Sequence, residues 1–117
     1  MTKHGHQWIH MDAHYPQGLG FDLAEQFGSA GEMVFVLFLC ACKRSFPQGR
    51  IRYRAEDEAL VLLGVNFPLV DNTGEKWCLE DLWKWLRYRR MVSTCTRNGV
   101  RMVTACNWDA WEMSGAR

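Results

Sequence analysis

The 117 residues match the size of a single domain, and we expect one domain over 1–117 with frayed ends at 1–6 and 113–117. Hydrophobic residues make up 48% of the chain and charged residues 23%, which excludes a disordered or membrane-spanning composition. The longest apolar run, 33–42, is about half of a membrane span, and residues 1–20 lack the apolar core of a signal peptide. We therefore expect a cytoplasmic protein that does not enter a membrane.

The cysteines and histidines do not form the pattern of a disulfide framework or a metal site. The five cysteines are odd in number and contain no C-x-x-C pair, so reduced thiols are expected. His6, His10 and His14 would share one strand face, but residues four apart in a strand are separated by about 13 Å. One strand cannot close around a single ion, and we expect neither a metal site nor a cofactor.

The N-terminal part of the chain predicts a strand and two helices. Alternation of apolar and polar residues predicts a half-buried strand over 7–15, and a short helix is expected over 22–27. Ser29 and Glu32 have the spacing of a capping box that would start the next helix. Residues 30–43 are apolar nearly all round, which favours a central core helix by length, with a buried strand as the alternative.

A short strand and a helix are expected next. Residues 50–54 alternate arginine with Ile51 and Tyr53, which predicts a strand with a basic face. Residues 55–64 begin with acids and end at Gly64, as expected for a helix with a favourable first turn and a glycine stop.

The clearest helix is predicted over 79–91, after a long connection over 65–78. At 100° per residue its apolar side chains share one face. These side chains are Leu79, Leu82, Trp83 and Leu86. Lys84, Arg87 and Tyr88 lie on the opposite face, where solvent or a partner would meet them.

A β-hairpin is predicted at the C-terminal end, with strands over 91–96 and 100–106. Asn98 and Gly99 between them are the residues that a type I′ turn prefers. The expected register pairs Arg97 with Val100, Thr96 with Arg101 and Cys95 with Met102.

The basic residues are concentrated although the net charge is only +1. Eleven of the 14 Lys and Arg fall in the stretches 33–55 and 82–108, which contain no Asp or Glu. Such segregation lets a nearly neutral protein present one positive face to a polyanion. The candidate DNA-binding residues are Lys84, Arg87, Tyr88, Arg90, Arg97, Arg101, Arg50 and Arg52.

The expected order of core helix, strand, helix, helix and hairpin is the winged-helix arrangement. The residues that carry a closer resemblance are Trp8-Ile9-His10-Met11-Asp12, Val36, Leu37 and Leu39, Gln48-Gly49-Arg50-Ile51, Leu63-Gly64-Val65, Leu82, Leu86, Met91-Val92, Asn107-Trp108 and Trp111. Over 8–111 the chain resembles the winged-helix domains of replication-initiation and replisome-organiser proteins of phages and other mobile elements. In helix-turn-helix proteins the second helix of the pair enters the major groove, which here would be 79–91.

The resemblance implies an α+β fold, a winged helix-turn-helix with three to four helices and a C-terminal β-hairpin wing. It implies binding of double-stranded DNA in replication, excision or transcriptional control, with no enzymatic activity. No serine elbow, P-loop or dinucleotide fingerprint is present. The alternative is a winged helix whose basic and aromatic surface binds a host or phage protein, and a homodimer remains open.

Overall fold

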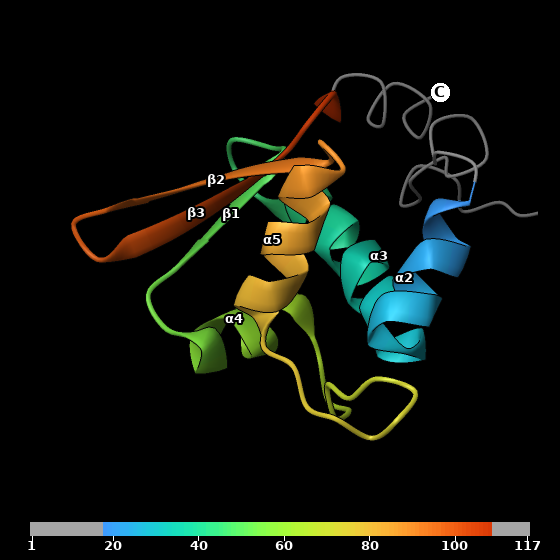
Figure 1. The fold of residues 1–117 in the computed structure, drawn as a ribbon. Helices are drawn as coiled ribbons and strands as arrows, with labels where there is room; N and C mark the ends of the chain where they lie inside the picture. The colour runs from blue at the N-terminus through green and yellow to red at the C-terminus, as the bar shows by residue number, and fades with distance from the viewer. Residues whose placement is uncertain (1–17, 109–117) are drawn as a thin grey trace, which may run out of the picture.

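The computed structural model describes residues 18–108, so the strand predicted over 7–15 lies outside the described part. Its elements are α2 (Leu19–Phe27), α3 (Ser29–Arg44), β1 (Arg50–Tyr53), α4 (Glu56–Leu63), α5 (Leu79–Tyr88), β2 (Val92–Arg97) and β3 (Val100–Ala105). The predicted α+β class is confirmed, with four helices and a three-stranded antiparallel sheet in this part of the chain (Figure 1). None of these helices is long and apolar enough to cross a membrane.

A glycine, and not the predicted capping box, separates α2 from α3. Gly28 has a φ of 75° and occupies the N-cap position, so Ser29 is already the first helical residue and caps nothing with its side chain. A Cβ at position 28 would lie 2.8 Å from the carbonyl oxygen of Val70. The capping box is therefore wrong, because the chain leaves helical geometry at the glycine, one residue earlier than predicted.

The apolar segment after Gly28 is a helix, as its length favoured. α3 buries side chains on most of its circumference, with Val34, Phe38 and Cys42 fully inaccessible to solvent. It contacts α2, α4, β1 and β3, which explains why its sequence lacks a wide polar face. The alternative of a buried strand is excluded.

The connection between α4 and α5 is tied to the rest of the fold. α4 ends at Gly64, as predicted, with the Gly64 amide bonded to carbonyls of the last turn. In the following loop the Asn72 side-chain amide donates to the Ala24 carbonyl at 3.0 Å, and the Trp77 indole donates to the Phe27 carbonyl at 3.0 Å. Both acceptors belong to the last turn of α2, so the loop holds α5 against α2.

α5 has the two faces that its sequence predicts, but it is shorter. The predicted apolar residues Leu79, Leu82, Trp83 and Leu86 are all buried. The helix ends at Tyr88, three residues before the predicted end at 91. Arg90 adopts a φ of 62°, a left-handed conformation that a right-handed helix cannot contain, and the chain turns there into β2.

The sheet has the strand order β1-β3-β2, and the predicted hairpin register is confirmed residue by residue. Asn98 and Gly99 have φ values of 54° and 77°, as a type I′ turn requires. Helices α3, α4 and α5 contact the sheet, and Ile51, Val92 and Val103 are buried beneath them. We call this the inner face of the sheet and the opposite side its outer face.

Trp83 lies where three elements meet. Its side chain is completely buried, and its indole nitrogen donates a hydrogen bond to the hydroxyl of Tyr53 on β1 at 2.8 Å. The ring of Phe38 from α3 lies 5.1 Å away between centroids. One side chain therefore fixes α5 against both the sheet and the core helix.

Replacing Tyr53 with phenylalanine tests this arrangement. Tyr53→Phe leaves a buried indole N–H without an acceptor, which costs about 1–3 kcal/mol of the free energy of unfolding. Urea unfolding followed by tryptophan fluorescence measures the change. Tyr88→Phe is the matched control, because Tyr88 is 85% exposed and its hydroxyl supports no packing, so a change within about 0.5 kcal/mol is expected. Equal effects of both substitutions would contradict the assignment.

Candidate nucleic-acid interface

The exposed face of α5 carries three of the predicted site residues. Lys84, Arg87 and Tyr88 are all exposed, because the opposite face of this helix is buried against the core. Within residues 18–108 neither Lys84 nor Arg87 forms an ion pair with a carboxylate. Their positive charges are therefore available to an anionic ligand.

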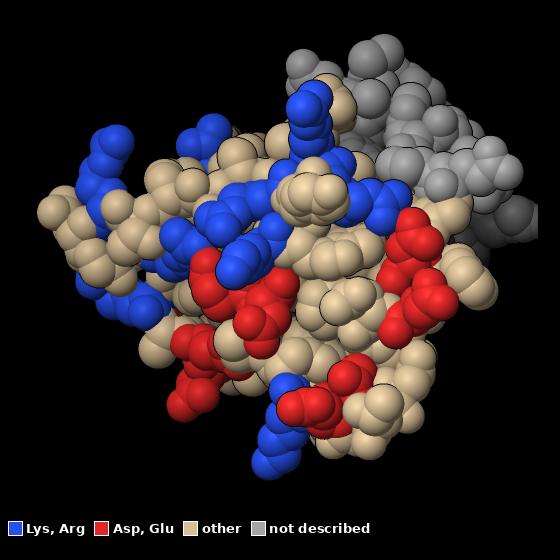
Figure 2. All heavy atoms as spheres, in the orientation of Figure 1, with Lys and Arg blue, Asp and Glu red and all other residues tan. Residues whose placement is uncertain are grey.

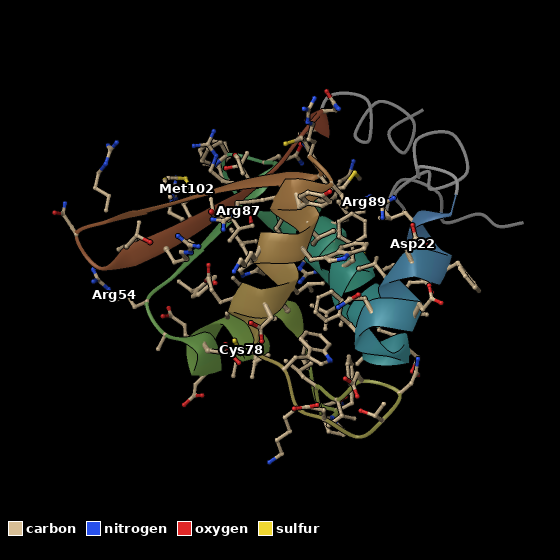
Figure 3. The ribbon with its side chains drawn as sticks, in the orientation of Figure 1. Asp22, Arg54, Cys78, Arg87, Arg89 and Met102 are labelled. Atoms are coloured by element: carbon tan, nitrogen blue, oxygen red, sulfur yellow. The ribbon has the colours of Figure 1, made fainter. Side chains whose placement is uncertain are left out.

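Arg87 is held in place by a neutral partner. Its guanidinium donates a hydrogen bond of 2.7 Å to the hydroxyl of Thr94 on β2, and Figure 3 shows it above the junction of α5 and the hairpin. A hydroxyl orients the side chain without cancelling its charge. The contact thus links the helix to the hairpin and leaves a cation between them.

Arg101 lies on the same side of the sheet but is neutralised. Its guanidinium forms an ion pair with Glu80 of α5 and donates to the Thr96 hydroxyl at 2.9 Å, with 19% of the side chain exposed. Asp81, the neighbouring acid, accepts from the Cys78 amide at 3.0 Å and caps α5. Both carboxylates in the first turn of α5 therefore have partners inside the chain.

The other predicted DNA-binding residues do not all lie beside the exposed face of α5. Side chains alternate between faces along a strand, and directly paired residues point the same way. The register therefore puts Arg50, Arg52 and Arg97 on the outer face of the sheet, away from α5. Arg90 follows α5 and is exposed.

Figure 2 shows how the charges are distributed over the face that carries α5. Lys and Arg gather in a band over the hairpin and the C-terminal part of α5, while acids lie beside the band, toward α4 and over α2. One of the acids on α2, Asp22, forms a 2.9 Å ion pair with Arg89. Arg89 also lies 5.0 Å from the centroid of the Trp85 ring, so this cation joins helices and was not among the predicted site residues.

A groove that the sequence did not predict lies beside the α5 face. It has a volume of about 500 Å³ and opens between α2, the 65–78 loop and α5. The residues that line it are Gln26, Phe27, Asp71, Trp77, Asp81, Lys84, Trp85 and Tyr88. The Phe27 ring packs edge-on against both indoles, with centroids 5.0 and 5.9 Å away. Only tertiary contacts bring these aromatic side chains together.

Asp71 keeps a negative charge in the lining of the groove. Hydrogen bonds from the Thr73 hydroxyl, at 2.6 Å, and from the amides of Thr73 and Glu75 hold the pKa of the Asp71 carboxyl below its usual value. The groove therefore combines aromatic walls with the carboxylates of Asp71 and Asp81 and the ammonium of Lys84.

The cysteines are free thiols in different environments. Burial raises the pKa of Cys42 to about 12, so this thiol stays protonated and unreactive at neutral pH. Cys95 is exposed on the outer face of the sheet. Residues 18–108 contain no group of three or more His, Cys, Asp or Glu that could hold a metal ion. The four histidines lie outside the described residues.

Comparison with known proteins gives no relative. No protein-family model matches the chain, and no curated protein or solved structure is significantly similar to it.

The ion pair between Glu80 and Arg101 can be measured by a double-mutant cycle. Glu80→Ala, Arg101→Ala and the double variant should give a coupling energy of about 0.5–1 kcal/mol in urea unfolding at low salt, as expected for a partly exposed pair. High salt should reduce it by screening. Asp57→Ala with Arg101→Ala is the control cycle, because Asp57 is exposed and does not contact Arg101. Coupling energies of equal size in both cycles would show that the ion pair between Glu80 and Arg101 does not stabilise the fold.

Proposed function

We propose that this chain is a small non-enzymatic DNA-binding protein of the winged-helix type. α5 would enter the major groove of duplex DNA, and the β2–β3 hairpin would be the wing that contacts the backbone beside it. The observation that carries the proposal is the exposed, basic face of α5, joined to the hairpin by the hydrogen bond from Arg87 to Thr94.

The order of elements supports this proposal. α3, β1, α4, α5 and the hairpin follow one another in the order of a winged helix, and β1 completes the sheet by pairing with β3. In helix-turn-helix proteins the second helix of the pair reads the major groove, and α5 is the second helix here. The processes proposed, replication, excision or transcriptional control of a phage or mobile element, rest on the sequence resemblance alone.

The chemistry of the α5 face fits duplex DNA. Lys84 and Arg87 can neutralise phosphates and release counterions, and Arg87 can also meet the O6 and N7 atoms of guanine. Acids at the start of a groove-binding helix would repel phosphates. Here Glu80 is paired with Arg101 and Asp81 is used as a cap, which reduces that repulsion.

Fluorescence anisotropy with a random duplex over a salt series tests the proposal. Lys84→Ala/Arg87→Ala should weaken binding at least about tenfold. The negative slope of log K against log salt should become shallower by about 2, since each lost phosphate contact reduces its magnitude by about 0.9. Lys76→Ala is the control, because Lys76 is an exposed cation in the loop before α5. Circular dichroism verifies that each variant is folded. Unchanged affinity in the folded double variant would refute the α5 interface.

The groove beside α5 favours a second candidate function, the binding of a host or phage protein. An aromatic cleft whose lining includes two carboxylates, Asp71 and Asp81, and the ammonium group of Lys84 suits an apolar side chain flanked by charged ones. Absence of duplex binding by the wild-type protein at low salt would reject the first function. Cross-linking of a protein from a photoreactive residue at Gln26, which lines the groove, would then support the second.

A further inference from the structure

We propose that the outer face of the sheet is a second DNA-binding surface, which takes the phosphodiester backbone of a second duplex while α5 holds the first. The proposal rests on the proposed function and extends it from one interface to two. The observation behind it is that the strand register places Arg50, Arg52 and Arg97 on the outer face of the sheet.

The strand register gathers three arginines on the outer face. Arg50 is paired with Thr104 and Arg52 with Met102 across β1 and β3, while Arg97 lies at the hairpin end of β2. The hydroxyls of Thr104 and its partner Ser93 lie among them. Guanidinium and hydroxyl groups are the donors that proteins use to bind phosphate oxygens.

The charges on this face are not compensated by the described part of the chain. None of the three strands contains an Asp or a Glu. The Arg50 guanidinium donates only to the sulfur of Met102, at 3.7 Å, which is a weak acceptor and carries no charge. Arg52 and Arg97 are exposed and form no ion pair within residues 18–108.

The described helices leave this face open. The residues beneath the helices, Ile51, Val92 and Val103, belong to the other set of alternating side chains. A molecule bound to Arg52 and Arg97 would therefore meet the sheet from the side opposite α5. One short, straight duplex cannot contact the outer face and the exposed face of α5 together, because duplex DNA resists bending over such a length.

The chemistry of the outer face favours a duplex backbone over a single strand or a protein. Its strand positions carry no aromatic side chain on which an unpaired base could stack, and single-strand binders depend on such stacking. It also lacks a large apolar anchor of the kind that dominates protein interfaces. Three cations and two hydroxyls on one face of the sheet fit a row of phosphates.

A bridging assay tests the second surface directly. A duplex of about one helical turn, too short to wrap around the protein, is fixed to beads, and protein is added with a second, fluorescent duplex of the same length. Wild-type protein should retain the fluorescent duplex. Arg50→Ala/Arg52→Ala, on β1 and outside the hairpin, should retain at least about tenfold less, while its affinity for a single duplex falls by less than about threefold.

Lys84→Ala/Arg87→Ala is the matched variant, because it also removes two positive charges. It should lose both single-duplex affinity and bridging, so that the two variants separate the surfaces. A fluorescent single strand of the same length should be retained poorly by the wild-type protein.

Each other outcome overturns the inference in a recognisable way. If the wild type binds one duplex but retains no second one, the outer face is not a DNA site and the proposed function stands. If Arg50→Ala/Arg52→Ala bridges as well as the wild type, the bridging comes from two copies acting through α5. Equal retention of single strand and duplex contradicts the duplex assignment, and failure to bind any duplex removes the proposed function as well.

Discussion

The buried indole of Trp83 is the contact on which the geometry of this chain depends. It faces inward from α5, donates to Tyr53 of β1 and packs against Phe38 of α3, so the helix has one permitted rotation about its axis. Since residues opposite a buried helical face must meet solvent, that rotation presents Lys84 and Arg87 outward. The interface is thus determined by packing in the core.

Polar contacts outside that core join α5 to the β2–β3 hairpin. Arg87 reaches Thr94 on β2, and the pair of Arg101 with Glu80 ties β3 to the first turn of α5. The first contact leaves its cation charged, whereas the second cancels it. Arg87 and Arg101 therefore differ: the charge of Arg87 has no carboxylate partner within residues 18–108, whereas Arg101 joins the hairpin to α5 through an ion pair.

Much of the fold could be predicted because short-range chemistry determines it. Asn98 and Gly99 fix the hairpin register, and the spacing of apolar residues fixes the buried face of α5. The start of α3 could not be predicted, since Gly28 is required by the nearby backbone of Val70. The division of the arginines between the two faces of the sheet could not be predicted either, because it depends on the long-range pairing of β1 with β3. The groove was missed for the same reason, since it depends on contacts of Phe27 with Trp77 and Trp85.

The central claim is that α5 and the hairpin together form the surface that meets duplex DNA. The most direct measurement is a titration of ¹⁵N-labelled protein with a short duplex, followed by amide chemical-shift changes. We expect the largest changes at Lys84, Arg87 and Tyr88 and in the hairpin, with small changes at Phe27 and Trp77 on the α2 and loop side of the groove. Large changes at Phe27 and Trp77 without changes at Arg87 and in the hairpin, or no changes at a saturating duplex concentration in low salt, would contradict this interface.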